Sequence, residues 1–258
     1  MRKPFGPLYS KYYDLLYSDK DYEAECDYVV SLFREYSKRP VRSILELGAG
    51  TGGYSMVLGR RGYAVLGVDA SKDMLDIARS KAAKKRLESA VRFRTGDIKG
   101  LRLGGGFDAC ICMFAVMNYL GSIDDVKAAF RSVADSVGDG GLFIFDYWNG
   151  DAALALGPSP RHKIVKSGDT VVIRVSDPTP RPDEGKVDVR FTTFVLEKKR
   201  LVHEFVETHQ MRYLFRDELQ QALSESGFSL ESLHPFMKPD SPVTPRDWSV
   251  TAVARRVR

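Results

Sequence analysis

The stretch Ile44-Leu45-Glu46-Leu47-Gly48-Ala49-Gly50-Thr51-Gly52-Gly53 decides the fold of this chain. Its apolar beginning predicts a buried strand over Ser43–Leu47, and a helix is expected over Gly53–Arg61. In the turn between them, glycine tolerates positive φ and, having no Cβ, lets a ligand approach the backbone. A second apolar run ends in Asp69, 21 residues after Gly48. Open α/β nucleotide sites hold a ribose-binding carboxylate at about this place, so the two stretches together predict a nucleoside site.

Glu46 separates two kinds of nucleotide site. Gly48, Gly50 and Gly53 also satisfy the G-x-G-x-x-G pattern of dinucleotide sites, so the glycines alone do not exclude NAD. A dinucleotide places its pyrophosphate at the N-terminus of the next helix, and a carboxylate at the strand end would oppose that anion. S-adenosylmethionine has no phosphate and carries an ammonium and a sulfonium, which an acidic residue favours. Glu46 therefore favours S-adenosylmethionine over an NAD-dependent oxidoreductase, and a glycine turn without a ligand is the remaining alternative.

The run E-L-G-A-G-T-G over Glu46–Gly52, followed by Asp69, resembles the first two motifs of class I S-adenosylmethionine-dependent methyltransferases. The resemblance implies cofactor contacts from the loops after the first four strands. Carried over by position, the expected contacts are Glu46, Gly48, Ala49 and Gly50 at the methionine end, Asp69 at the ribose, Ala70, Ser71, Met74, Asp97 and Ile98 around the adenine, and Met113 and Phe114 toward the substrate. Asp97 could instead cap a turn, and Met113 and Phe114 could be core residues.

Strand and helix patterns alternate through the first part of the chain and predict an α/β fold. We expect a Rossmann-like, mostly parallel, seven-stranded sheet with helices on both faces. The further expected strands are Tyr63–Val68, Val91–Thr95, Phe107–Phe114, Leu142–Tyr147, Phe228–Phe236 and Trp248–Arg255, and the further expected helices are Ser71–Glu88, Ile123–Val137 and Arg216–Ser226.

The alternation breaks at Asn149-Gly150. Up to Pro182 the chain carries five prolines and no convincing long helix. The runs Thr170–Ser176, Val187–Glu197 and Leu201–Tyr213 alternate as antiparallel strands do. We therefore expect residues 150–212 to form a small antiparallel β insertion on the substrate side. Residues 41–149 and 213–258 then form the core.

Residues 1–40 are expected to be a helical segment that covers the cofactor site. Tyrosines recur at helical spacing over residues 8–17, Tyr22–Tyr36 forms a second amphipathic stretch, and Asp19 or Asp21 is its expected cap.

The segment Tyr12-Tyr13-Asp14-Leu15-Leu16-Tyr17, followed by Lys20-Asp21-Tyr22, Glu23 and Glu25, resembles the N-terminus of the sugar-nucleotide N-methyltransferases. Those enzymes dimethylate the amine of dTDP-linked amino-deoxysugars. The resemblance implies a catalytic Tyr13 that reaches the substrate amine, with Tyr17 and Tyr22 near the cofactor. The family has a histidine after the fourth strand where this chain has Tyr119, so Tyr119 is expected to take that catalytic place, which weakens a histidine-base mechanism. Tyr13 and Tyr17 could instead form an apolar helix face, and His203 and His209 are interpreted as structural.

Charge and cysteine usage narrow the partners. The net charge of +5 suits an anionic ligand such as a nucleotide sugar, although it does not demand one. The expected substrate-binding cations are Arg161, Lys163, Arg174, Arg212 and Arg246. Cysteines and histidines show no metal-ligand spacing, so no metal is expected, and the lysine-rich run near residue 84 is interpreted as a solvated face rather than a nucleic-acid site. The N-terminal stretch lacks a signal peptide's apolar core, no apolar run is long enough for a membrane helix, and a cytoplasmic protein is expected, compatible with a homodimer.

The sequence thus predicts an S-adenosylmethionine-dependent methyltransferase with a small-molecule acceptor, foremost the amine of a nucleotide-linked amino sugar. The alternatives are an O- or N-methyltransferase of another small metabolite, an NAD-dependent oxidoreductase, and a cofactor-binding protein without catalytic activity.

Overall fold

A computed structural model of the chain describes residues 4–257. Residues 1–3 lie outside the described residues. They are part of the N-terminal stretch from which a cytoplasmic protein was predicted. No helix in the described part is both long enough and apolar enough to cross a lipid bilayer.

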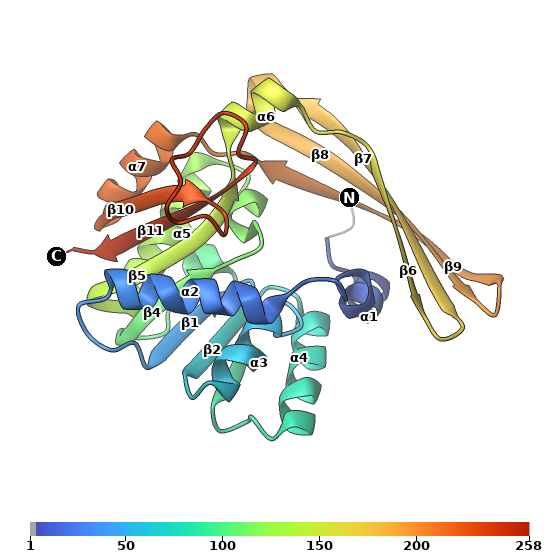
Figure 1. Cartoon of the computed structure of the whole chain (residues 1–258), viewed down its shortest axis with the longest axis horizontal. Helices are drawn as coiled ribbons and strands as arrows, with labels where there is room; N and C mark the ends of the chain where they lie inside the picture. The colour runs from blue at the N-terminus through green and yellow to red at the C-terminus, as the bar shows by residue number, and fades with distance from the viewer. Residues whose placement is uncertain (1–3, 258) are drawn as a thin grey trace.

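A seven-stranded sheet forms the centre of the molecule, with the strand order β10-β11-β5-β4-β1-β2-β3 (Figure 1). Only β11 among these strands runs against its neighbours, because it pairs antiparallel with both β5 and β10. This confirms the predicted α/β class with a mostly parallel sheet. The strands are β1 (Ser43–Leu47), β2 (Ala64–Asp69), β3 (Val91–Thr95), β4 (Phe107–Cys112), β5 (Val137–Trp148), β10 (Phe228–Pro235) and β11 (Ser249–Arg256).

β1 lies in the middle of the sheet, between β2 and β4. Helices cover both of its faces, which is why its side chains are almost all apolar. Leu45 and Leu47 pack on the face covered by α5 (Ile123–Ser136) and α7 (Arg216–Glu225). Ile44 packs on the opposite face, with α2 (Tyr22–Tyr36), α3 (Gly53–Arg60) and α4 (Lys72–Lys85). Figure 1 shows α2 crossing the front of this face.

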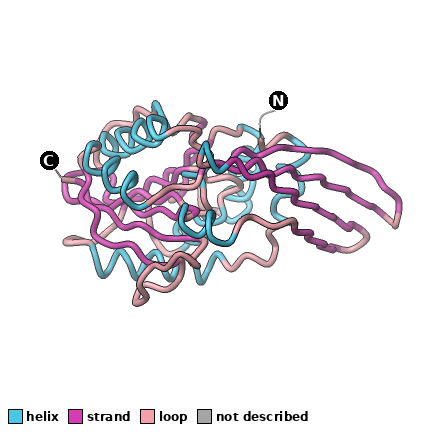
Figure 2. The backbone as a smooth tube through the Cα atoms, turned by 90° about the horizontal axis from the view of Figure 1, so that it is seen from above, coloured by secondary structure: helices cyan, strands magenta, loops and turns pink. Residues whose placement is uncertain are grey.

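A second, four-stranded antiparallel sheet follows the fifth strand. Its strands, in order, are β6 (Arg161–Ser167), β7 (Thr170–Arg181), β8 (Lys186–Glu197) and β9 (Arg200–Arg212), and α6 (Gly150–Leu156) leads into it. Figure 2 shows this sheet extending away from the seven-stranded one. Helix α1 (Pro7–Leu16) packs on it, with Tyr9, Tyr12 and Leu16 against Val172 and Val195.

Several boundaries differ from those expected. The tyrosine-rich N-terminal region forms two helices, and Asp21 rather than Asp19 caps the second, accepting a bond from the Ala24 N–H at 3.0 Å. Strand β4 ends at Cys112 instead of Phe114, because Phe114 and Ala115 have φ of +72° and +57°, which no strand accommodates. Three short 3₁₀ helices, η1 (Ile98–Gly100), η2 (Val116–Tyr119) and η3 (Pro182–Glu184), were not expected either.

β5 and β7 are longer than predicted. β5 begins at Val137 instead of Leu142, and its pairing with β4 shifts register between Phe107 and Ala109. β7 contains Pro178 and Pro180, and these prolines are tolerated because pairing with β6 ends at Ser176 while pairing with β8 continues. α6 and β6 were missed, since seven residues with weak periodicity do not stand out in a sequence.

Candidate active site

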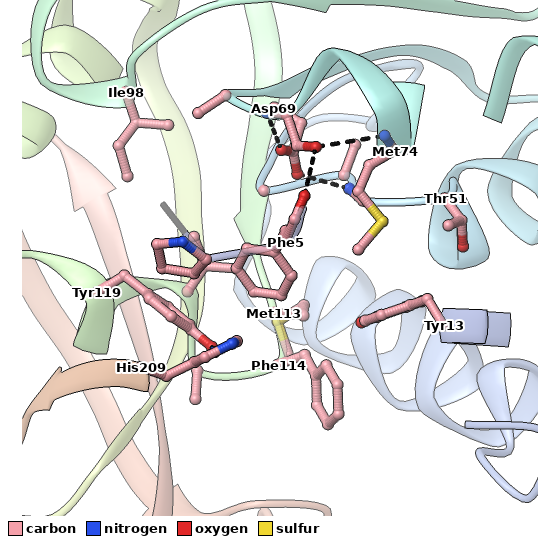
Figure 3. Close-up of a pocket in the computed structure, with 18 of the residues that line it drawn as sticks. Phe5, Tyr13, Thr51, Asp69, Met74, Ile98, Met113, Phe114, Tyr119 and His209 are labelled. Carbon is pink, nitrogen blue, oxygen red and sulfur yellow. Dashed lines mark hydrogen bonds between the residues drawn. The ribbon is translucent and has the colours of Figure 1, made fainter. Parts of the chain in front are cut away.

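A cavity of about 930 Å³ lies at the carboxyl ends of the parallel strands, between the two sheets. Its lining comes from the loops after β1, β2 and β4, from α1, and from β8 and β9 of the antiparallel sheet. Figure 3 shows Asp69, Met113, Tyr13 and Tyr119 around it. Ligands of open α/β sheets bind at this edge, because the strand ends leave a crevice there.

The glycine loop after β1 forms one wall of the cavity. Gly48 and Gly50 have φ of +68° and +53°, in the left-handed region that other residues rarely adopt. A Cβ on Gly48 would collide with Val116, whereas a Cβ on Gly50 would meet no atom within 4 Å. The backbone of Gly50 therefore faces open space in the cavity, as close approach of a ligand requires.

Asp69 ends β2 opposite this loop. Its carboxylate accepts bonds from the backbone N–H of Gly50 at 2.8 Å and of Ser71 at 2.7 Å (Figure 3). Burial raises the pKa of Asp69, and these two donors oppose that rise. The carboxylate thus fixes the glycine loop to the start of α4 and lines the cavity. Ala70 and Met74 line the same region, where Ser71 caps α4 by accepting from the Met74 N–H at 3.3 Å.

Asp97, Ile98, Met113 and Phe114 also line the cavity. Asp97 caps η1 by accepting from the Lys99 N–H at 3.0 Å. It therefore caps a turn and lines the cavity at the same time, so the two predicted roles do not exclude each other. Met113 is 3% exposed, and Phe114 is 38% exposed with its ring against Tyr17.

Glu46 does not line the cavity, so its predicted direct contact with a ligand is not found. Side chains alternate along a strand, and Glu46 therefore shares the face of Ile44, which α3 covers. Its carboxyl is 2% exposed and accepts a hydrogen bond from the Ser55 hydroxyl of α3. Burial raises the pKa of Glu46 to about 8. Near pH 7 Glu46 is therefore mostly protonated, so it links β1 to α3 through Ser55 and presents little charge to the cavity.

The tyrosines of α1 and α2 close the cavity from the N-terminal side. Tyr13 lines it from α1, Tyr17 from the C-cap position directly after α1, and Tyr22 from the start of α2. The ring of Tyr22 lies directly against Gly53, leaving no room for a Cβ there. Figure 3 shows Tyr13 directed toward Met113.

Lys20 and Glu25 were not predicted as site residues. They form an ion pair whose side chains are 8% and 12% exposed, and both line the cavity near the glycine loop. The Lys20 ammonium lies 4.1 Å from the ring centre of Phe114, and the Tyr54 hydroxyl donates to Glu25. Opposite charges this close together suit the ammonium and carboxylate of an amino-acid group. Both residues belong to the N-terminal motif quoted above, and that motif is the sequence feature from which they could have been predicted as site residues.

One further carboxylate in the cavity lining and one behind it were also missed. Asp146 of β5 lines the cavity, is 4% exposed and accepts from the Ala115 N–H at 2.9 Å, and burial raises its pKa to about 6. Glu207 of β9 accepts from the backbone N–H of Phe5 at 3.0 Å and of Gly6 at 2.8 Å. Nothing in the local sequence pattern marks either residue, because their partners are distant in the chain.

His209 and Tyr119 meet on the antiparallel-sheet side. The Tyr119 hydroxyl lies 2.7 Å from His209 Nδ1, and His209 Nε2 lies 3.1 Å from Glu207 (Figure 3 shows the first pair). His209 is 1% exposed and satisfied by these bonds, as expected of a structural histidine, yet it also lines the cavity. The Phe5 ring lies against both Tyr119 and His209.

None of the five predicted substrate-binding cations lines the cavity, which corrects the expectation that they converge there. Lys163 pairs with Asp19 at 2.5 Å, and Arg212 pairs with Glu218 at 2.7 Å. Arg174 is buried behind the wall, where it donates to the hydroxyls of Tyr9 and Tyr17. Arg161 and Arg246 are exposed. The direction of each of these side chains depends on the strand register and on its ion-pair partner. The sequence pattern reveals neither.

Metal ligation has no candidate within residues 4–257, since these hold no group of three or more histidine, cysteine, aspartate or glutamate side chains placed to bind an ion.

Comparisons with known proteins point to one family. A family model described as a methyltransferase domain matches residues 44–141. The dTDP-3-amino-3,4,6-trideoxy-alpha-D-glucopyranose N,N-dimethyltransferase of Streptomyces venezuelae is 30% identical over 224 residues, which cover 86% of this chain and 90% of that protein.

Two solved structures share the fold over nearly their whole length. An S-adenosylmethionine-dependent methyltransferase from Clostridium acetobutylicum has a TM-score of 0.81 at 21% identity, covering 97% of this chain and 98% of that one. A sugar N-methyltransferase from Streptoalloteichus has a TM-score of 0.82 at 21% identity, covering 100% and 96%.

The residues at the cavity fit the cofactor of that family. The open face of Gly50 admits a ligand to the backbone, Asp69 offers a carboxylate to a ribose, and Lys20 with Glu25 complements an amino-acid end. With this fit and with a likeness that runs through both sheets, the chain belongs to the class I S-adenosylmethionine-dependent methyltransferases.

Proposed function

We propose that this enzyme methylates the amine of a nucleotide-linked amino sugar. The observation that carries the proposal is the likeness to the Streptomyces venezuelae enzyme, whose name specifies a dTDP-amino sugar and N,N-dimethylation. That likeness covers 86% of the chain, so it includes the antiparallel sheet as well as the nucleoside site. The cavity supports it, because one continuous volume joins Asp69 to Tyr13, Tyr119 and His209.

The bound S-adenosylmethionine would supply an electrophilic methyl group on a positively charged sulfur. We assign its ribose to Asp69, its methionine end to the glycine loop and the Lys20–Glu25 pair, and its adenine to the region of Ile98 and Met74. The protein's task is then to align the acceptor nitrogen and exclude water, since a sulfonium is already a good leaving group.

The acceptor would lie against the aromatic wall of the cavity. Tyr13, Tyr17, Phe114, Tyr119 and Phe191 line this part. Aromatic faces attract cations, and an ammonium is the form in which a sugar amine arrives near neutral pH. The Tyr13 hydroxyl, on a side chain that is 8% exposed, is proposed to orient the amine by a hydrogen bond.

Mass spectrometry of reactions with purified protein tests this function. Amino-sugar dTDP nucleotides with S-adenosylmethionine are expected to gain one or two methyl groups, whereas the matching nucleotides with a hydroxyl in place of the amine are expected to gain none. Methylation of the hydroxyl compounds alone, or of a pooled metabolite extract but no amino sugar, would favour the alternative acceptors.

The carboxylate of Asp69 is expected to contribute to cofactor affinity. Asp69→Asn removes the charge that holds the ribose hydroxyls, and S-adenosylhomocysteine should bind about 1–3 kcal/mol more weakly, roughly 5- to 150-fold. Calorimetric titration measures this change. Asp76→Asn is the matched control, because Asp76 is an exposed residue of α4 paired with Lys72. Equal affinity in both variants would remove the ribose assignment.

Tyr13→Phe is expected to lower the methyl-transfer rate about tenfold or more while leaving cofactor affinity unchanged, since only the hydroxyl that orients the amine is lost. Single-turnover kinetics and calorimetry separate the two quantities. Tyr12→Phe is the control: Tyr12 precedes Tyr13 on α1, its buried hydroxyl has no hydrogen-bond partner, and it lies outside the cavity lining. A parallel loss of rate and cofactor affinity would assign Tyr13 to the cofactor instead.

The homodimer and the cytoplasmic location stay predictions. Light scattering of the purified protein gives the assembly mass, and a single-chain mass at working concentration would contradict the homodimer. Fractionation of the producing cells tests the location.

A further inference from the structure

A buried chain of three titratable side chains ends at the substrate side of the cavity. Glu207 and His209 of β9 are 9% and 1% exposed, and Tyr119 of η2 is partly exposed and lines the cavity. The distances are 3.1 Å between Glu207 and His209 and 2.7 Å between His209 and Tyr119. We propose that these three residues form a relay that takes the proton from the acceptor ammonium. The proposal rests on the proposed amine acceptor and adds a catalytic base to it.

The hydrogen-bond partners decide where the protons lie. The backbone N–H groups of Phe5 and Gly6 both donate to Glu207, an arrangement that stabilises an ionised carboxylate. An ionised carboxylate only accepts, so His209 must carry its proton on Nε2. Nδ1 is then an acceptor, and the Tyr119 hydroxyl donates to it. The oxygen of Tyr119 keeps its lone pairs free for a donor in the cavity.

The proposed step moves two protons and changes no bond to carbon. An N–H bond of the acceptor ammonium breaks and its proton joins the oxygen of Tyr119, while the original hydroxyl proton passes to Nδ1 of His209. The products are a neutral amine with a free electron pair and an imidazolium beside the Glu207 carboxylate. After product release the imidazolium returns a proton to the Tyr119 oxygen while the tyrosine hydroxyl releases its own proton to water in the cavity, which resets the relay. Burial raises the pKa of Tyr119, so the tyrosine passes the proton on instead of acting as a phenolate.

In the proposed step His209 becomes an imidazolium, so the groups around its ring matter. The ring is enclosed by Phe5, Tyr9 and Phe191. The titratable and charged groups around it are Glu207 at Nε2, the hydroxyls of Tyr9, Tyr17 and Tyr119, and Arg174 behind Tyr9 and Tyr17. Glu207 contacts the ring directly at 3.1 Å, whereas Tyr9 and Tyr17 stand between the ring and Arg174.

The relay also accounts for Tyr119 in the place where the resembled family has a histidine. The tyrosine extends the reach of a histidine that comes from a different strand. The sequence pattern points to a base after β4 and favours a structural role for His209, because the contact with Tyr119 joins segments 90 residues apart.

The test uses pH to distinguish a proton acceptor from a packing residue. Single-turnover methylation of a dTDP-amino sugar is measured from about one pH unit above to two units below the pKa of the free amine. We compare the unchanged protein with His209→Asn, which keeps an acceptor for Tyr119 but takes up no proton. Tyr119→Phe interrupts the same relay by removing the hydroxyl that receives the proton from the substrate. His203→Asn is the matched control, because His203 lies on the same strand with its ring against Tyr12.

Below the pKa of the amine, His209→Asn is expected to lose about tenfold in rate for each pH unit, because only the neutral fraction of the substrate then reacts. Above that pKa its rate should approach that of the unchanged protein. Tyr119→Phe should behave likewise, and His203→Asn should match the unchanged protein throughout. Stabilisation of each variant by S-adenosylhomocysteine in a thermal-shift assay confirms a folded cofactor site.

An unchanged rate in His209→Asn, or a loss of equal size at every pH, would overturn the relay. The proposed function is judged separately by the unchanged protein: if it methylates no sugar amine at any pH, that function fails and the relay fails with it. If the amine is methylated but the variants show no pH-confined loss, only the relay fails.

Discussion

Gly50→Val is expected to abolish cofactor binding. The Cα of Gly50 faces space in which a Cβ would meet no atom within 4 Å, so a valine side chain would fill the path by which the ligand approaches the backbone. The φ of +53° adds strain, because a β-branched residue is strongly disfavoured there. We expect the affinity for S-adenosylhomocysteine to fall more than about 100-fold, equivalent to about 3 kcal/mol. Calorimetric titration measures it.

Gly62→Val separates blocked access from backbone strain. Gly62 also has a positive φ, +92°, and a Cβ there would likewise meet nothing within 4 Å. It lies in the exposed turn between α3 and β2, outside the cavity lining. Both variants should lose thermal stability, but only Gly50→Val should lose the ligand. Binding of normal strength by Gly50→Val would remove the nucleoside from this loop.

Glu46→Gln is expected to stabilise the cofactor-free protein at alkaline pH. The pKa of Glu46 is 4.5 in the unfolded reference and about 8 in the fold, so the folded protein holds the proton more tightly. The contribution of Glu46 to the free energy of unfolding is therefore fully present below pH 4.5, falls as pH rises and is lost above about pH 8. Glutamine carries no charge at any pH, so the variant should gain about 3–5 kcal/mol at pH 8 and nothing near pH 4.

Denaturant unfolding at a series of pH values measures this gain as the difference between the two proteins. Taking the difference removes the slope contributed by Asp146, whose pKa is also raised. Glu88→Gln, at an exposed position, is the control and should change the stability little at any pH. If Glu46→Gln is destabilised at pH 8, Glu46 is ionised and well solvated in the fold, contrary to its burial.

The sequence predicted correctly those elements that depend on neighbouring residues, such as the first strand and the glycine loop that follows it. The strand Ser43–Leu47 is apolar because helices cover both faces, and Gly48 and Gly50 are needed because of their positive φ, so one short stretch predicted both strand and loop. Asp69 followed from its position at the end of the next strand. In contrast, the end of β4 depends on the unusual backbone of Phe114, which no propensity predicts.

The missed site residues depend on contacts between distant segments. His209 becomes a candidate base only through Tyr119, 90 residues away in the chain. Glu207 is tied to Phe5 across 202 residues. The predicted cations lie outside the cavity lining for the same reason: residue type gave their charge, but strand register and local ion pairs set the direction of their side chains. Glu46 was found by its chemistry, yet the alternation of β1 places it beneath the loop instead of in the cavity.

The two prolines of β7 make one stretch of the antiparallel sheet's edge a poor template for another strand. Past Ser176 the strand has no pairing with β6, so its outer side is a free edge on which another polypeptide could add. Such edges nucleate fibrils, and chains without backbone donors at the edge are poor templates. Pro178 and Pro180 remove two donors from this stretch. A strand added along this part of the edge would therefore lack two of the backbone donors that a sheet ladder needs.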